Sequence, residues 1–144
     1  MEKWKAIEDF EAYEVSNLGR VRRRLPSRTS KVGKQLNTTF HTNSGYVTLV
    51  LRKAGKSYTK NLHRLVAKAF VSNPQNLPQV NHKDGNKDHN EASNLEWRSN
   101  IGNMRHSTQI GIVPLCWVLE RYFGTKEEVR KALDKALASL PYIP

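Results

Sequence analysis

Cysteine is almost missing from this sequence, in which Cys116 is the one thiol among 144 residues. A single cysteine excludes an internal disulfide and a cysteine-rich structural zinc site. A chain of this length can form one compact domain or two small ones without a disulfide scaffold. We therefore expect the protein to occupy a reducing compartment.

Long apolar runs are missing as well. The opening residues, M-E-K-W-K-A-I-E-D, lack the apolar segment of a secretory signal, and no run approaches the roughly 20 residues that a membrane-spanning helix requires. These absences predict a soluble, intracellular protein that does not enter the membrane.

Acidic residues are absent from the whole stretch between Val15 and Lys83, although the chain has a net charge of +11. Such a surface repels itself unless a polyanion is present, so we expect a nucleic-acid partner. A basic surface that serves only solubility is the alternative, but solubility would not require the loss of every carboxylate from half the chain. The cations predicted to bind DNA are Arg20, Arg22, Arg23, Arg24, Arg28, Lys31, Lys34, Arg52, Lys56, Lys60 and Arg64.

The first 24 residues alternate in polarity and contain a turn signal at Gly19, which predicts short strands around a glycine turn. Trp4 and Tyr13 are expected to fill a small core. Phosphate contacts, which position a protein without reading sequence, are expected from Ser16, Asn17, Arg20 and Arg22.

The middle of the chain combines a loop, a hairpin and a helix. Residues 25–42 are rich in Pro, Ser and Gly and predict a mobile loop that becomes ordered on DNA. Residues 46–51 and 57–61 flank a turn at Gly55 and predict a β-hairpin. Residues 62–70 place apolar side chains at helical spacing, so an amphipathic helix is expected there.

Residues 80–106 concentrate histidine and asparagine. The piece K-D-G-N at 83–86 predicts a tight turn directly after His82. Leu95, Glu96 and Trp97 form a short β-prone piece, and Ser99 is a plausible N-cap for a helix that carries Asn103 and His106 on one face. A strand, a turn, a strand and a helix are thus predicted in that order.

These motifs, L-H-R-L-V-A-K-A-F (62–70), V-N-H-K-D-G-N-K-D-H-N (80–90), N-L-E-W (94–97) and N-x-x-N-x-x-H (100–106), resemble the HNH homing endonucleases of phages and introns, which have a ββα-metal fold. Trp4 with Y-E-V-S-N-L-G-R-V-R (13–22) resembles the NUMOD4-like module that often precedes this nuclease domain. The resemblance extends from about residue 4 to residue 106 and implies a phage-encoded protein in a bacterial host.

The resemblance implies a role for each matching residue. His82 would be the general base, and Asn94 would pin the loop and orient His82. Asn81 and Asn103 would hold one Mg²⁺ or Mn²⁺ ion, with no zinc because paired cysteines are missing. Some relatives carry Asp at the position of Asn81, and an amide brings no charge, so weak metal binding is expected. Three roles are open for His106: it could be a third metal ligand, contact a phosphate, or lie on the helix surface without a role in the site.

Four other polar residues are assigned structural roles. His63 opens the predicted helix, and Asp84 and Asp88 are expected to form turns. His89 is expected to lie exposed in a loop. The role of general base is assigned to His82 by the resemblance alone.

We expect an α+β protein with an antiparallel β-rich DNA-binding module at 1–55, a ββα-metal HNH nuclease domain at 56–110, and a C-terminal segment with an amphipathic helix at 111–144. A capping box, T-K-E-E at 125–128, predicts where that helix begins. The expected function is metal-dependent hydrolysis of double-stranded DNA. A monomer with one site cuts one strand in each binding event, so a nick in one strand is expected unless the C-terminal segment dimerises. The alternative is a catalytically silent DNA-binding regulator on the same scaffold. The sequence leaves open whether a monomer or a dimer acts, and no small-molecule substrate is expected.

Overall fold

The computed structural model describes residues 1–28, 30–41, 44–100, 102, 103, 106 and 131. The chain divides into two units, Met1–Asn100 and Ile101–Pro144. The elements that follow belong to the first unit, and the predicted capping box and C-terminal helix lie outside the described residues. No helix among the described residues is long and apolar enough to cross a membrane.

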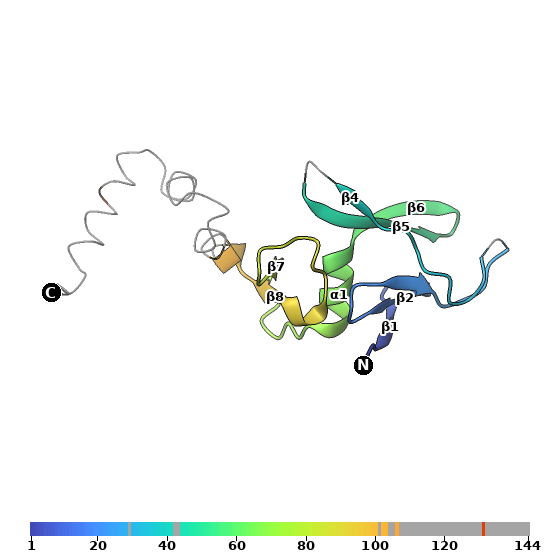
Figure 1. Ribbon diagram of the computed structural model, residues 1–144, viewed down its shortest axis with the longest axis horizontal. Coiled ribbons are helices and arrows are strands. Elements are labelled where there is room, and N and C mark those ends of the chain that lie inside the picture. The colour runs from blue at the N-terminus through green and yellow to red at the C-terminus, as the bar shows by residue number, and fades with distance from the viewer. Residues whose placement is uncertain (29, 42–43, 101, 104–105, 107–130, 132–144) are drawn as a thin grey trace. The chain divides into compact units, whose positions relative to one another are not determined.

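The N-terminal residues form the predicted strands around a glycine turn. Strands β1 (Trp4–Ile7), β2 (Phe10–Ser16) and β3 (Val21–Arg23) make an antiparallel sheet in the order β1-β2-β3 (Figure 1). Gly19 has a φ of 76° in the turn between β2 and β3, a backbone conformation that glycine adopts without the steric cost of a Cβ atom. A Cβ atom at Gly19 would also lie 3.0 Å from the backbone oxygen of Asn90.

Two predictions for the N-terminal residues are wrong. Trp4 is only half-buried, and the guanidinium of Arg22 lies 3.9 Å above its ring, so Trp4 is not part of the core. Ser16 is fully buried, and its hydroxyl accepts hydrogen bonds from the backbone N–H groups of Leu18 and Arg20. Ser16 therefore shapes the turn and is not available to a phosphate.

A second antiparallel sheet contains β4 (Thr39–His41), β5 (Tyr46–Lys53) and β6 (Lys56–Asn61) in that order. The β5–β6 hairpin was predicted, whereas β4 lies at the end of the stretch that was expected to be a mobile loop. All three residues of β4 are exposed at the edge of the sheet, so they show no alternation of polarity by which a sequence pattern could identify a strand. The predicted loop is held further by the backbone N–H of Leu36, which donates to the carbonyl of Val21.

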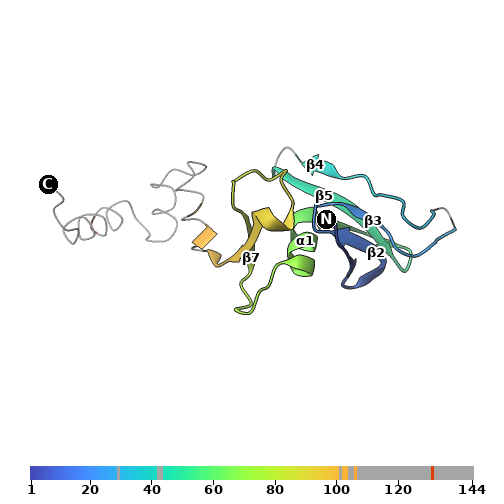
Figure 2. The same ribbon diagram turned by 60° about the horizontal axis from the view of Figure 1, so that its bottom comes forward.

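Helix α1 (Leu62–Phe70) follows β6 directly and has the predicted range. It contacts both three-stranded sheets, and two views show it beneath β5 and beside β2 (Figures 1 and 2). The hydroxyl of Tyr13 joins the two sheets, because it accepts hydrogen bonds from the backbone N–H of Arg52 and from the side chain of Arg23. The apolar core at this junction contains Ile7, Phe10, Tyr13, Val15, Val21, Val47, Leu49, Leu51, Leu62, Leu65, Val66, Ala67, Val80 and Leu95.

The last two strands of the first unit, β7 (Gln79–His82) and β8 (Leu95–Arg98), pair antiparallel as a separate two-stranded sheet. A loop at 83–91 and a short 3-10 turn, η1 (Ala92–Asn94), connect them. Residues 83–94 are called the hairpin loop below. The backbone becomes helical at Asn100, directly after Ser99, as the sequence predicted. The fold is therefore mixed and rich in strands, with α1 as the central helix of the first unit.

Candidate active site

His82 is the last residue of β7 and is only 5% exposed. Its Nε2 lies 3.2 Å from Oδ1 of Asn90. The amide of Asn90 can present only its oxygen to the ring, because its Nδ2 donates to the carbonyls of Lys87 and Asp88. Nε2 of His82 must therefore carry the proton, which leaves Nδ1 as the basic nitrogen of the neutral ring.

Burial also favours the neutral form of His82. It lowers the pKa of the ring below the ordinary value, against a smaller opposing effect of the hydrogen bond to Asn90. A histidine with a lowered pKa is unprotonated at neutral pH, which is the state that a general base requires.

Asn94 holds the hairpin loop by three hydrogen bonds from its side chain. Its Nδ2 donates to Oδ1 of Asp84 and to the carbonyl of His89, both at 2.9 Å, and its Oδ1 accepts the backbone N–H of Asp84 at 3.2 Å. The side chain of Asn94 thus joins the two ends of the hairpin loop, and its role in orienting His82 stays a prediction. The direct bond to the ring of His82 comes from Asn90, which the sequence analysis missed, although Asn90 ends the same V-N-H-K-D-G-N-K-D-H-N motif.

Asp84 forms the turn that was predicted for it, since its Oδ1 accepts the backbone N–H of Asn86 at 2.8 Å. Its Oδ2 lies 2.7 Å from Nδ1 of the exposed His89. Desolvation acts to raise the pKa of Asp84, but the hydrogen bonds from Asn94, His89 and Asn86 together outweigh it and lower the pKa to about 2. The same pairing with Asp84 raises the pKa of His89.

Asn81 precedes His82 and is 7% exposed. It lies directly opposite Glu96 in the β7–β8 register, and its Nδ2 donates to Oε1 of Glu96 at 2.8 Å. Arg98 donates to the same carboxylate oxygen at 2.7 Å. Oδ1 of Asn81 is an amide oxygen, and amide oxygens are suitable ligands for Mg²⁺.

Asn103 and His106 have helical backbone and belong to the second unit, so their roles as metal ligands remain predictions. No group of three or more His, Cys, Asp or Glu side chains suited to a metal occurs among the described residues. The predicted ligands Asn81 and Asn103 are amides, so they would not belong to a group of His, Cys, Asp or Glu side chains.

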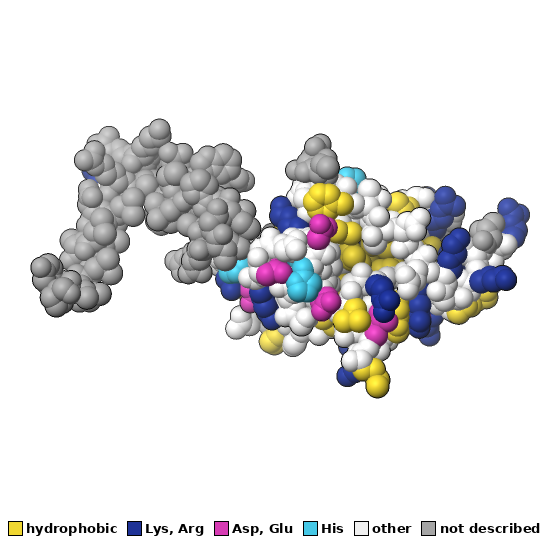
Figure 3. All heavy atoms as spheres, in the orientation of Figure 1, with side chains coloured by type: hydrophobic (Ala, Val, Ile, Leu, Met, Phe, Trp, Pro, Cys, Tyr) yellow, Lys and Arg dark blue, Asp and Glu magenta, His cyan; other side chains and the backbone are white. Residues whose placement is uncertain are grey.

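The predicted DNA-binding cations fall into two groups. Five contact protein groups. Arg20 pairs with Glu2 and Arg22 with Glu14. The other three donate hydrogen bonds: Arg23 to the hydroxyl of Tyr13 and the carbonyl of Leu25, Arg24 to the carbonyl of Glu11, and Arg64 to the carbonyl of Pro78. Within the described part of the chain, no ion pair to a carboxylate forms at Arg28, Lys31, Lys34, Arg52, Lys56 or Lys60. In one view Lys and Arg side chains gather beyond the β5–β6 turn, whereas acidic and histidine side chains gather over the hairpin loop (Figure 3).

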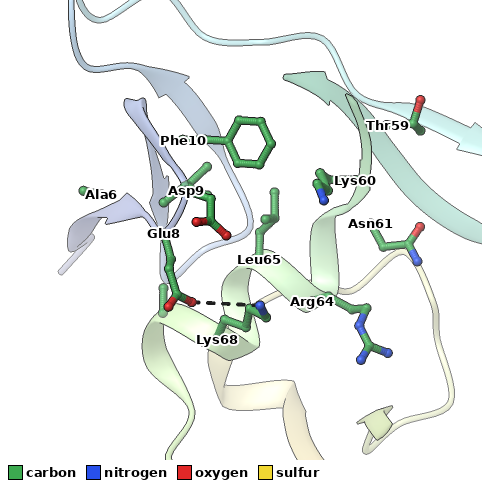
Figure 4. Close-up of a pocket in the computed structure, with 12 residues that line it drawn as sticks. Ala6, Glu8, Asp9, Phe10, Thr59, Lys60, Asn61, Arg64, Leu65 and Lys68 are labelled. Carbon is green, nitrogen blue, oxygen red and sulfur yellow. Dashed lines mark ion pairs between the residues drawn. The ribbon is translucent and has the colours of Figure 1, made fainter. Parts of the chain in front are cut away.

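A hollow of about 350 Å³ lies between the β1–β2 turn and α1. Acidic and basic side chains share its lining, and Glu8 pairs with Lys68 across 3.9 Å (Figure 4). None of the predicted catalytic residues lines this hollow, so it belongs to the scaffold and not to the candidate active site.

Comparison with known proteins gives three findings. The NUMOD4 motif matches residues 2–52. An HNH endonuclease of Acanthamoeba polyphaga mimivirus is 44% identical over 110 residues, which are 76% of this chain and 31% of that protein. DNA endonuclease I-HmuI of Bacillus phage SP01 is 41% identical over 96 residues, which are 66% of this chain and 51% of that enzyme.

A solved structure is also similar. It is described as DNA binding and cleavage by the HNH homing endonuclease I-HmuI, and it matches with a TM-score of 0.66 at 32% identity. The match covers 94% of this chain and 66% of that one. This chain thus spans about a third to a half of the length of these two curated relatives.

Proposed function

This chain belongs to the HNH homing endonuclease family, and from that membership we propose that it is a metal-dependent endonuclease that hydrolyses double-stranded DNA. The observation that carries the proposal is the state of His82. Its ring is buried and neutral, and its Nε2 is committed to Asn90, so Nδ1 is left as a base. The relative from a Bacillus phage supports a phage-encoded protein that acts inside a bacterial cell.

In the proposed reaction Nδ1 of His82 accepts a proton from a water molecule. The hydroxide attacks the phosphorus atom, and the bond from phosphorus to the 3′ oxygen of the neighbouring sugar breaks. Asn90 takes no part in proton transfer in this scheme. Its amide oxygen accepts a hydrogen bond from Nε2–H of His82, which keeps the ring in one tautomer. Asn94 acts through the hairpin loop and does not touch the DNA.

Asn81 and Asn103, with His106 as a third candidate, would hold one Mg²⁺ or Mn²⁺ ion. Such an ion would neutralise charge on the scissile phosphate and stabilise the departing oxygen. The oxygen donors of Asn81 and Glu96, which a hydrogen bond between the two side chains holds together, are of the chemical type that suits a hard cation. Neutral amide ligands would give a weak site, so activity should depend on added metal without tight metal binding.

The proposed architecture of the nuclease is ββα-metal, in which β7, β8 and the helix that begins at Asn100 supply the three elements. One such site cuts one strand in each binding event, which favours a nick. The predicted cations whose side chains form neither an ion pair nor a hydrogen bond within the described residues, Arg28, Lys31, Lys34, Arg52, Lys56 and Lys60, are proposed to contact DNA phosphates. A steep salt dependence is then expected, with a slope of about −0.9 in log K against log salt for each phosphate neutralised.

A plasmid-relaxation assay with Mg²⁺ or EDTA tests the proposal. Wild-type protein should nick supercoiled DNA with Mg²⁺ only, and His82→Ala should cleave about 10²–10⁴-fold more slowly. His41→Ala is the matched control, because His41 is an exposed histidine on the edge strand β4. Gel-shift affinity should stay within about twofold for both variants, since phosphate contacts to surface cations dominate affinity.

Two results would contradict the proposal. Binding without cleavage by the wild-type protein would favour the DNA-binding regulator. Loss of binding together with cleavage in His82→Ala would make His82 a structural residue or a DNA contact.

A further inference from the structure

His63 is a buried titratable residue that the proposed reaction does not use. It lies in the first turn of α1 and is 4% exposed, and its Nδ1 is fully enclosed with no hydrogen-bond partner among the described residues. Burying an unpaired ring nitrogen is unfavourable, and an apolar side chain of similar size would avoid that cost. The unpaired ring nitrogen of His63 therefore does not contribute to stability, and its contacts show what the ring can do.

The ring of His63 lies against the ring of His82, with centroids 5.2 Å apart and planes at 56°. On α1 it also lies against Tyr46, at 4.7 Å and 31°. Tyr46 is itself near His82, at 6.3 Å and 29°. Three rings from β5, α1 and β7 thus form one cluster, which we call the ring cluster.

Tyr46 is also contacted by the hairpin loop. Nζ of Lys87 lies 4.4 Å from the centroid of the Tyr46 ring and donates to the carbonyl of Ser44 at 2.9 Å. A Cβ atom at Gly45 would come within 3.1 Å of the Lys87 side chain, so the loop and the β4–β5 connection are in close contact. Besides β5, α1 and β7, which supply its rings, the ring cluster is therefore packed against the hairpin loop.

The hydrogen bond to Asn90 fixes one atom of the His82 ring. A single bond to Nε2 leaves the ring free to tilt about that atom, whereas proton abstraction requires Nδ1 to meet a water molecule at hydrogen-bond distance. Contact with a flat neighbour removes the remaining freedom. His63 supplies this contact without adding charge, because burial, with smaller effects of His82, Arg64 and Lys87, lowers the pKa of its ring to about 3.

We infer that His63, backed by Tyr46, is a positioning residue that fixes the ring plane of His82 for proton abstraction. The inference rests on the proposed nuclease function, since His82 is the base of that reaction. It assigns the ring cluster a purpose that a packing role alone does not predict: the flat face at position 63 matters, and not only its volume.

Two substitutions separate shape from volume. His63→Phe keeps a flat aromatic face, while His63→Leu fills similar space without one. Val66→Ala is the control for lost stability, because Val66 is fully buried on the same helix and has no ring to contribute. The measurements are the single-turnover cleavage rate with Mg²⁺, the Kd for target DNA, and the side-chain rotamer of His82 from NMR couplings.

The expected result is a rate within about threefold of wild type for His63→Phe and Val66→Ala, and about 10–100-fold lower for His63→Leu, with Kd unchanged within twofold. NMR should show one His82 rotamer in wild type and His63→Phe, and rotamer averaging in His63→Leu. Full activity in His63→Leu, or an equal loss in His63→Phe, would overturn the inference.

Two features of the experiment keep its outcomes distinct. If His63→Leu does not fold, Tyr46→Leu tests the same cluster from β5, and a single His82 rotamer with full cleavage in that variant would overturn the inference. If wild-type protein does not cleave at all, the proposed function fails, yet the rotamer of His82 still decides whether His63 positions it.

Discussion

The β5–α1 scaffold and the β7–β8 hairpin are stabilised by different means. Leu49, Leu51 and Val66, on β5 and α1, are at most 2% exposed and belong to one apolar core. The hairpin contributes only Val80 and Leu95 to that core, while its buried polar residues are Asn81, His82, Asn90 and Asn94. Apolar burial thus dominates one region, and amide hydrogen bonds dominate the other.

This difference teaches how the protein can separate stability from chemistry. Apolar burial depends on area and tolerates small shifts, whereas hydrogen bonds fix the direction of a donor and an acceptor. The hairpin needs direction, because Asn90 sets the tautomer of His82 and Asn94 holds the turn at Asp84. Substitutions in the scaffold should therefore mainly lower the free energy of unfolding, and substitutions in the hairpin should mainly lower the cleavage rate.

The largest effect on stability is expected from Leu51→Ala in the scaffold. Leu51 is fully buried, so the lost transfer free energy and the remaining cavity should lower the free energy of unfolding by about 2–5 kcal/mol. Urea unfolding measures this loss. Cleavage per folded molecule, measured well below the midpoint of thermal unfolding, should be nearly unchanged, and a parallel loss of cleavage would contradict the separation of the two regions.

The free energy of unfolding is expected to depend on pH through His63, which lies where the two regions meet. The folded protein does not protonate His63 until pH falls to about 3, whereas the unfolded chain binds a proton near pH 6.5. The unfolded state therefore binds more protons between these values, and stability falls as pH decreases through this range. At pH 4.5, two pKa units below 6.5, this effect should lower the free energy of unfolding by roughly 2–3 kcal/mol relative to pH 7, from about 1.4 kcal/mol for each pKa unit.

His63→Phe isolates that contribution, because the carboxylates and the other histidines titrate in both proteins. Urea unfolding at pH 7 and pH 4.5 should show a smaller decrease for His63→Phe than for wild type. An equal decrease in both proteins would mean that His63 is protonated in the folded state at pH 4.5.

The smallest effect on stability is expected from Asn94→Ala in the hairpin. Its three hydrogen bonds go to Asp84 and His89, which lie in a loop that water can reach. The free energy of unfolding should therefore fall by only about 1 kcal/mol. Cleavage should nevertheless fall by more than tenfold, because the turn that follows His82 is no longer fixed.

Asn86→Ala is the matched control for Asn94→Ala, since Asn86 is an exposed amide of the same loop that accepts one backbone hydrogen bond. Its cleavage rate should remain near that of wild type. A loss of cleavage in Asn86→Ala as large as in Asn94→Ala would show that any disturbance of the loop is sufficient.

Local patterns were enough to predict the regular elements of the first unit. The apolar spacing from Leu62 to Phe70 predicted α1 to the residue, and the β-prone run after Tyr46 with the turn at Gly55 predicted the β5–β6 hairpin. These predictions succeed because side-chain period and turn chemistry act over a few residues. Strand β4 was missed because an exposed edge strand has no such pattern, and its pairing with β5 is decided by a partner elsewhere in the chain.

The sequence by itself determined the chemistry that this chain can offer: a histidine and several amides in one segment, a basic surface, and one cysteine. Only the tertiary structure decided which of those groups meet. The hydrogen bond to the ring of His82 comes from Asn90, and His63 on α1 contacts the same ring although it lies 19 residues earlier in the chain. Contacts of this kind depend on how α1 and the hairpin pack in three dimensions, and spacing along the sequence contains no information about that packing.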